Sequence, residues 1–199
     1  MTRRGETKAE VEYAIRRLFY RVTYYGNALN HSTAMQSGWS NDSAQEYAYR
    51  AYLNQFDHDG TLLDLGCGDG QLLHFLINRT NVNLIPFGVD FLPESISLAR
   101  ESMPQYRNNF FVANVTRYDP SPMRFDYILT NPHYAILDEQ RDFLCRTYDW
   151  LKSAGRLLVY EYEGAAGYDS LFDLCSSIGL ANPKYTRGQG VALVRYDHP

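Results

Sequence analysis

Cysteine is scarce in this 199-residue chain, and its spacing forms no pattern. The three cysteines, Cys67, Cys145 and Cys175, are odd in number, lie far apart and include no pair separated by two residues. A disulfide framework and a structural zinc site both need paired ligands at short, regular spacing. The sequence therefore predicts no disulfide scaffold and no metal site, and it suits a reducing cytoplasm.

The chain also lacks a long apolar run and an excess of positive charge. No apolar segment approaches the roughly 18 residues of a membrane span, and residues 1–5 lead into charged residues, unlike a secretory signal. The 19 Lys and Arg against 23 Asp and Glu give a net charge of −4. Such a balance exerts no general attraction on a phosphate backbone. We therefore expect neither a membrane nor a nucleic acid as partner.

A short apolar run that breaks into three alternate glycines is the most informative feature that is present. Residues 62–65 are Leu-Leu-Asp-Leu, Gly66, Gly68 and Gly70 follow, and residues 71–78 have helical character. Glycine reaches backbone angles that a Cβ forbids and lets the main chain approach a ligand, and a helix N-terminus attracts one. The dinucleotide fingerprint G-x-G-x-x-G would need the third glycine one residue later. A nicotinamide dehydrogenase is therefore disfavoured.

Residues 64–70, Asp-Leu-Gly-Cys-Gly-Asp-Gly, resemble motif I of the class I S-adenosylmethionine (SAM) methyltransferases, D/E-x-G-x-G-x-G. The resemblance extends over about residues 61–196. It implies that Gly66, Cys67 and Gly68 line the methionine part of SAM and that Asp64 orients its amino group.

The downstream pattern alternates strands with helices, which predicts a doubly wound, mostly parallel α/β sheet. We expect strands at 62–65, 86–90, 110–113, 125–130 and 156–162, helices at 71–78, 94–102, 138–152 and 170–178, and a hairpin from 184–186 and 191–196. The family resemblance implies seven strands with one antiparallel. At this length we expect one domain, with residues 61–199 as the SAM-binding core and residues 1–60 as an N-terminal helical lid.

Within the lid, apolar residues at helical spacing predict an amphipathic helix over 8–24; they are Val11, Ile15, Leu18, Phe19 and Val22. Residues 26–42 are polar without a period, which is typical of a binding loop. A capping box at 43–46 begins a second helix that continues to Phe56. Four residues are candidates to close over the site, although packing or surface exposure explains each one alone: Tyr24, Tyr25, His31 and Trp39.

Further candidates stand where strands end, because open α/β sheets bind ligands at the carboxyl ends of their strands. Asp90 closes the second strand, and a carboxylate can accept hydrogen bonds from both ribose hydroxyls. The resemblance makes it the acidic residue of motif II, with Phe91 or Leu92 against the adenine. Asn114, followed by Val115, stands where the family usually has an aspartate, and its amide keeps an acceptor for the adenine amine.

The fourth strand ends in Asn131-Pro132-His133-Tyr134, which resembles the Asn-Pro-Pro-Tyr motif of amine methyltransferases acting on adenine or protein glutamine. In that motif Asn and the first Pro carbonyl hold the target amine, and the aromatic ring packs on it. Here His133 replaces the second proline, and an imidazole can serve as general base for a hydroxyl. The candidate catalytic residues are Asn131, His133 and Tyr134, and Asn131 is also a candidate SAM contact. Glu161 and Glu163 are expected to form a solvated pair.

Methyl transfer is an in-line displacement that depends mainly on positioning. The chain has no insertion before the terminal hairpin and no separate recognition domain, so we expect a small-molecule acceptor, methylated on O or N. One alternative is an amine methyltransferase that acts on nucleic acid or protein through residues 131–134. Another is a SAM-binding protein without catalysis.

Overall fold

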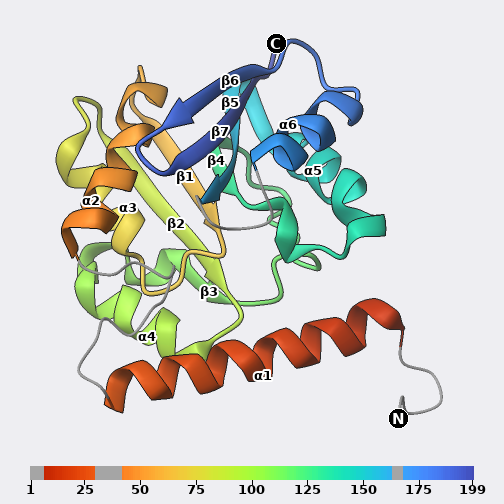
Figure 1. Cartoon of the computed structure of the whole chain (residues 1–199). Coiled ribbons are helices and arrows are strands. Elements are labelled where there is room, and N and C mark those ends of the chain that lie inside the picture. The colour runs from red at the N-terminus through yellow and green to blue at the C-terminus, as the bar shows by residue number, and fades with distance from the viewer. Residues whose placement is uncertain (1–6, 30–41, 163–167) are drawn as a thin grey trace.

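The computed structural model describes residues 7–29, 42–162 and 168–199, and it contains a single seven-stranded sheet (Figure 1). The strand order is β3-β2-β1-β4-β5-β7-β6. Pairings from β3 to β5 are parallel, and β7 runs antiparallel to both β5 and β6. This confirms the predicted doubly wound sheet with a terminal hairpin. The strands are β1 (Gly60–Leu65), β2 (Leu84–Asp90), β3 (Phe110–Val112), β4 (Phe125–Thr130), β5 (Leu151–Tyr162), β6 (Lys184–Gly188) and β7 (Val191–Asp197).

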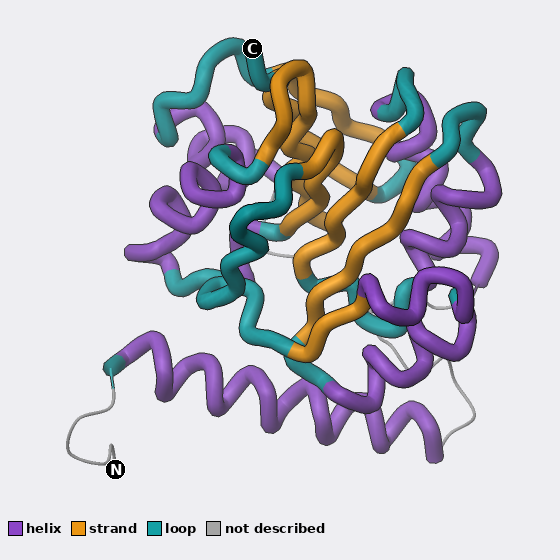
Figure 2. The backbone as a smooth tube through the Cα atoms, turned by 180° about the vertical axis from the view of Figure 1, so that it is seen from behind, coloured by secondary structure: helices purple, strands orange, loops and turns teal. Residues whose placement is uncertain are grey.

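Helices cover both faces of the sheet, as the view from behind also shows (Figure 2). Side chains alternate along a strand, so Leu62 of β1 packs with α2, α3 and α4, whereas its neighbour Leu63 packs with α5 and α6. The α-helices of the described residues are α1 (Lys8–Leu29), α2 (Asp42–Tyr49), α3 (Gln71–Arg79), α4 (Pro93–Ser102), α5 (Gln140–Tyr148) and α6 (Tyr168–Ser177). Short 3-10 helices are η1 (Arg50–Gln55), η2 (Pro104–Asn109), η3 (Pro132–Tyr134) and η4 (Leu137–Glu139).

Helix α1 lies across the edge of the sheet where the parallel strands end (Figure 1). The Tyr13 ring meets Phe91, just after β2, in an edge-to-face contact with centroids 6.0 Å apart. Arg16 donates a hydrogen bond to the carbonyl of His133, just after β4. Arg21 lies 3.2 Å from Glu94 at the start of α4. The helix therefore contacts the ends of both β2 and β4. A separate finding is that no described helix is long and apolar enough to cross a membrane.

The amino-terminal predictions need correction. The first helix continues to Leu29 instead of stopping near residue 24, so residues 26–29 are helical. The rest of the predicted loop, with His31 and Trp39, lies outside the described residues, as do the side chains of Tyr24 and Tyr25. The second helix is α-helical only to Tyr49 and continues as the 3-10 helix η1.

The apolar stripe of α1 does not pack into a core, contrary to the usual behaviour of an amphipathic helix. Val11 is half-buried, whereas the other four members are 62–65% exposed, namely Ile15, Leu18, Phe19 and Val22. The physical reason is that α1 contacts the sheet edge through Tyr13, Arg16 and Arg21, which lie on another side of the helix.

Replacing Leu18 with glutamate tests this placement. Because the side chain is 65% exposed, we expect the free energy of unfolding to change by less than about 0.5 kcal/mol, as for other surface substitutions. Leu129→Ala, at a fully buried position of β4, is the positive control and should cost about 2–5 kcal/mol. Urea denaturation measures both, and a large loss in Leu18→Glu would show that the stripe is packed.

The predicted helix over 138–152 is too long, and the fifth strand starts earlier than residue 156. Helix α5 ends at Tyr148 and β5 begins at Leu151, because the Phe125 N–H donates to the Trp150 carbonyl (2.9 Å) and brings this segment into the sheet. Gly155 therefore lies inside β5, where the register to β4 shifts, instead of closing a helix. A Cβ on Gly155 would lie 2.9–3.1 Å from three carbonyl oxygens.

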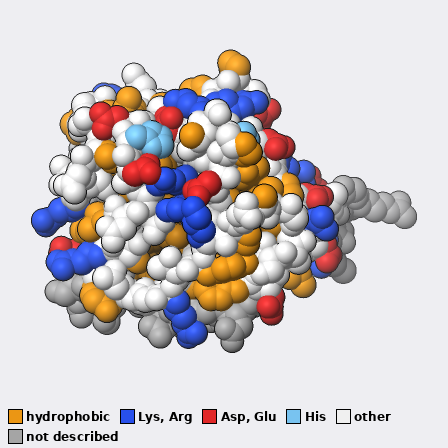
Figure 3. Space-filling view, turned by 90° about the horizontal axis from the view of Figure 1, so that it is seen from above, with side chains coloured by type: hydrophobic (Ala, Val, Ile, Leu, Met, Phe, Trp, Pro, Cys, Tyr) orange, Lys and Arg blue, Asp and Glu red, His pale blue; other side chains and the backbone are white. Residues whose placement is uncertain are grey.

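The opposite end of the sheet carries ion pairs that join β5 to β4 and to the segment between η1 and β1, and one ion pair within β7. Arg156 pairs with Asp57, and Arg195 Nε lies 3.1 Å from Asp197 Oδ1. Lys152 pairs with Asp126 at 2.7 Å. Seen from above, this face shows acidic and basic side chains interspersed (Figure 3). Charges of both signs therefore hold this end together, and they do not gather into a patch of one sign.

Candidate active site

The glycine turn after β1 has the strand–turn–helix geometry that the sequence predicts. Gly66, Gly68 and Gly70 have φ of 91°, 56° and 80°, in the left-handed region that a Cβ disfavours. The N–H groups of Gly66 and Cys67 both donate to the Val89 carbonyl, at 2.7 and 3.1 Å. This fastens the turn to β2, and α3 begins directly after it at Gln71.

Asp90, the last residue of β2, holds the other side of the turn. It is 5% exposed, and its Oδ2 accepts a hydrogen bond from the Gly68 N–H (3.1 Å) while Oδ1 accepts one from the Leu92 N–H (2.9 Å). Burial raises the pKa of Asp90 to about 6, and the hydrogen bonds from backbone N–H groups oppose this shift. Each carboxylate oxygen can accept a further hydrogen bond, so the residue can still receive a hydroxyl donor.

Asp64 of β1 lies buried beside the same turn. It is 2% exposed, and its Oδ1 has no hydrogen-bond partner among the described residues. Burial, reinforced by the charge of Asp90, raises the pKa of Asp64 to about 8. Thr130 Oγ1, at the end of β4, is also buried without a partner in the described part of the chain. Buried polar atoms are normally satisfied, so the surroundings of Asp64 Oδ1 suit a ligand that supplies a donor or a positive charge.

The segment after β4 uses its own polar groups to form a turn. Asn131 Oδ1 accepts a hydrogen bond from the His133 N–H at 2.8 Å and so caps η3. The Pro132 carbonyl accepts one from the Ala135 N–H at 3.1 Å. In the Asn-Pro-Pro-Tyr motif that this segment resembles, the corresponding two oxygens hold the target amine. In this structure each of them accepts a hydrogen bond from within the turn.

Tyr134 reaches from this segment to the glycine turn. Its hydroxyl lies 3.4 Å from the Gly66 carbonyl, to which it donates, and 3.3 Å from the Tyr160 hydroxyl. Its ring packs so closely that a Cβ on Gly66 would lie 2.3 Å from the ring carbon Cζ. The end of β4 and the turn after β1 are therefore in direct contact.

His133 lies against a buried carboxylate that the sequence analysis placed in solvent. His133 Nε2 is 2.7 Å from Glu161 Oε2, and the Glu161 side chain is only 4% exposed, so the expected solvated pair is wrong for this residue. Glu163 lies outside the described residues. On its other side, His133 Nδ1 lies 3.4 Å from Gln140 Nε2. The missed signal is the alternation along β5, which puts Glu161 on the side of buried Leu157 and Val159.

The remaining predicted site residues line the same edge less directly. Phe91 contacts Tyr13 of α1, whereas Cys67 and Val115 are 7% and 4% exposed. Asn114 Oδ1 accepts hydrogen bonds from both the N–H and the hydroxyl of Thr116, each at 3.0 Å. The structure therefore brings Asp64, the turn and Asp90 together, with residues 131–134 beside them.

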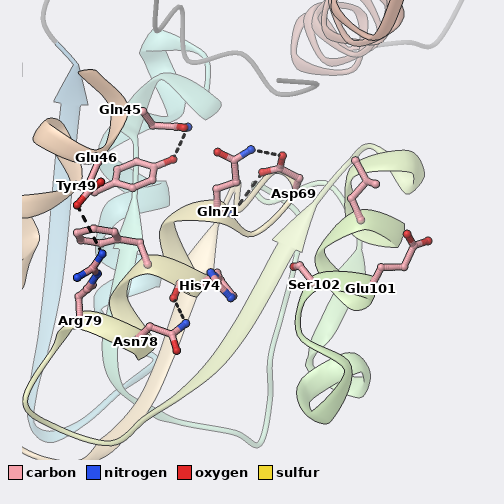
Figure 4. Close-up of a pocket in the computed structure, with 12 residues that line it drawn as sticks. Gln45, Glu46, Tyr49, Asp69, Gln71, His74, Asn78, Arg79, Glu101 and Ser102 are labelled. Carbon is pink, nitrogen blue, oxygen red and sulfur yellow. Dashed lines mark hydrogen bonds and ion pairs between the residues drawn. The ribbon is translucent and has the colours of Figure 1, made fainter. Parts of the chain in front are cut away.

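A groove of about 1050 Å³ lies on the other side of the glycine turn, between α2, α3 and α4 (Figure 4). Within it, Gln71 donates to Asp69 at 2.8 Å and Gln45 donates to Tyr49 at 2.8 Å. Neither Asp90 nor His133 lines it. The groove is therefore distinct from the cluster at the strand ends.

Comparisons with known proteins bear on the family and the fold. Residues 62–155 match the family model of a methyltransferase domain. A malonyl-[acyl-carrier protein] O-methyltransferase of Ilyobacter polytropus is 25% identical over 129 residues, which are 64% of this chain and 46% of that protein. The chain thus spans about half the length of this relative.

Solved structures of low sequence identity share the fold. One is the 1,6-didemethyltoxoflavin-N1-methyltransferase of Burkholderia thailandensis with bound 1,6-didemethyltoxoflavin and S-adenosylhomocysteine. It is 16% identical to this chain, the TM-score is 0.70, and the superposition covers 99% of this chain and 93% of the Burkholderia chain. The N-methyltransferase NodS of Bradyrhizobium japonicum, in complex with S-adenosylhomocysteine, is 15% identical with a TM-score of 0.61, covering 89% and 99%.

Proposed function

We propose that this chain, whose residues 62–155 match the family model of a methyltransferase domain, is a class I SAM-dependent methyltransferase that transfers a methyl group from SAM to a small-molecule acceptor. The observation that carries the proposal is the unpartnered Asp64 Oδ1, buried beside the glycine turn. A carboxylate in this position lacks the cation that would compensate its burial. The amino group of SAM has that charge.

The other residues of the turn also fit SAM. Its glycines have positive φ and no side chain, so the main chain of the turn is accessible to a ligand. Gly66, Cys67 and Gly68 would line the methionine part of SAM. Asp90 has acceptor capacity left for the ribose hydroxyls. When bound, SAM supplies a methyl group activated by the positive charge on sulfur. The protein's part is to hold that group and the acceptor in line.

We assign the remaining contacts to SAM and the acceptor from the positions of the residues at the strand ends. Phe91 and Val115 would flank the adenine, and Asn114 would meet its amine after exchanging its present bonds to Thr116. Asn131 and Tyr134 would contact SAM or the acceptor, because Tyr134 already touches Gly66. Residues 61–199 would form the SAM-binding core, and residues 1–60 would cover it.

Two observations support a small-molecule acceptor: the short segment between β5 and the terminal hairpin, and a solved structure of the same fold whose enzyme acts on a small molecule. The segment from β5 to the hairpin contains only α6 as a further helix among the described residues, and α1 crosses the site edge. The toxoflavin-precursor enzyme with the same fold is an example of a neighbour that acts on a small molecule. Transfer to an amine of nucleic acid or protein through residues 131–134 is less favoured, since Asn131 Oδ1 and the Pro132 carbonyl each already accept one hydrogen bond within the turn and His133 replaces the second proline of the motif.

Calorimetric titration with SAM, S-adenosylhomocysteine and NAD tests the proposal. We expect the first two to bind and NAD not to bind. Asp90→Ala removes a buried charged acceptor and should weaken SAM binding by about 1.5–3 kcal/mol, or about 10- to 150-fold. Asp119→Ala, at an exposed aspartate, is the matched control. Binding of NAD alone would overturn the assignment, and SAM binding without turnover of any acceptor would favour the non-catalytic alternative.

A further inference from the structure

We propose that Glu161 is a positioning residue for His133 and that the acceptor presents a hydroxyl group whose proton His133 takes. The inference rests on the proposed function and extends it from a general acceptor to a chemical class. It stands on the contact between the two side chains at the ends of β4 and β5, where His133 Nε2 and Glu161 Oε2 are 2.7 Å apart.

The burial of Glu161 is the first argument. A buried carboxylate is costly unless it is paired. One oxygen, Oε1, accepts a hydrogen bond from the Tyr162 N–H at 3.1 Å. The other, Oε2, faces His133 and has no aligned hydrogen bond among the described residues. Hydrogen bonds at catalytic sites are often poorly aligned before the ligands bind and tighten in the complex. The arrangement therefore suits a positive charge that forms on His133 during turnover.

The orientation of the ring is the second argument. A neutral imidazole carries one N–H and one lone pair. With Nε2 beside the carboxylate, the proton belongs on Nε2 and the lone pair on Nδ1. The neighbour of Nδ1 is the Gln140 amide at 3.4 Å, longer than a strong hydrogen bond, so an acceptor hydroxyl can displace it. The His133 side chain is 40% exposed, which leaves it accessible.

The demands of the acceptor are the third argument. A neutral amine attacks through its own lone pair, and a carboxylate arrives already deprotonated. A hydroxyl must lose its proton as it attacks, so of these three acceptors only the hydroxyl needs a base. In the step, the hydroxyl oxygen bonds to the methyl carbon, the carbon–sulfur bond breaks with its electron pair going to sulfur, and the hydroxyl proton moves to His133 Nδ1. The proton then leaves to solvent.

Transfer from [methyl-13C]SAM to the small molecules of a deproteinised cell extract identifies the methylated atom, because ether, ester and N-methyl carbons have distinct NMR shifts. We expect an ether signal from the wild type. Glu161→Gln keeps the shape and removes the charge. Because His133 remains, it should lower kcat about 10- to 100-fold, less than the roughly 10²- to 10⁴-fold that acid–base catalysis contributes as a whole, with little change in KM for SAM. Glu101→Gln, an exposed glutamate on α4, should behave like the wild type.

A second measurement needs no turnover. In 15N-labelled protein with SAM bound, His133, assigned by the signal lost in His133→Gln, should appear with its proton on Nε2 and hydrogen-bonded, and Glu161→Gln should lose that hydrogen bond. An N-methyl or ester product, an unchanged kcat in Glu161→Gln or a proton on Nδ1 alone would overturn this inference while the proposed function stands. No product at all despite SAM binding would instead refute the proposed function.

Discussion

Alanine at position 66 is expected to weaken SAM binding by about 10- to 100-fold. Gly66 has φ of 91°, where an L-residue with a Cβ is disfavoured by roughly 1–2 kcal/mol. The added Cβ would also lie 2.3 Å from Tyr134 Cζ. The turn must therefore change its conformation or push the Tyr134 ring away, and either response moves the main chain that would face the methionine part of SAM.

Two further variants separate the effect of backbone strain at position 66 from that of the steric clash with Tyr134. Gly188→Ala is the matched control, because nothing lies within 4 Å of a Cβ built there, and it should leave SAM binding unchanged. Adding Tyr134→Ala to Gly66→Ala removes the steric clash but not the backbone strain, so we expect only partial recovery. Calorimetry gives the affinities and circular dichroism checks the fold. Normal SAM binding by Gly66→Ala would mean that this glycine does not line the cofactor.

The succession of strands and helices along the chain was predictable from the sequence because each element carries a local signal. Residues 125–130 are mostly apolar and bounded by polar residues, and they form β4 without a shift. Gly179, with φ of 83°, follows the end of α6 as its sequence position suggests. Since parallel strands end at one edge of a sheet, the sequence also predicted that Asp90 and Asn131 lie along the same edge.

The errors occur where a distant partner decides the structure. No local pattern indicates that β5 begins at Leu151, because its start depends on a hydrogen bond between Trp150 and Phe125 of another strand. The stripe of α1 is apolar at helical spacing, yet polar contacts orient the helix. Glu161 lies outside any motif, and its meaning emerges only from its contact with His133. Local periodicity predicts where helices and strands lie in the sequence. Contacts between side chains of different elements can be identified only once the fold is known.

Asp64→Asn is expected to have opposite effects on stability and on SAM binding. In the folded, unliganded chain burial raises the pKa of Asp64 from 3.8 to about 8. Between these values the unfolded chain loses a proton that the folded chain keeps, so this residue lowers stability as the pH rises. The slope is about 1.4 kcal/mol per pH unit. Asparagine does not ionise, so the variant should exceed the wild type in free energy of unfolding by several kcal/mol at pH 8 and by much less at pH 5.

Binding should move the other way, because the proposed role of Asp64 is to meet the amino group of SAM. A cation beside Asp64 favours its ionised form, so SAM binding to the wild type at pH 7 should release a proton, measured as a heat that varies with the ionisation enthalpy of the buffer. Asp64→Asn should lose both this release and about 10- to 100-fold in affinity, the range for a hydrogen bond to a charged group. Asp119→Asn, at an exposed aspartate, should change neither quantity. If Asp64→Asn stabilised the chain but bound SAM normally, with the proton release intact, the buried carboxylate would have some other role than holding the cofactor.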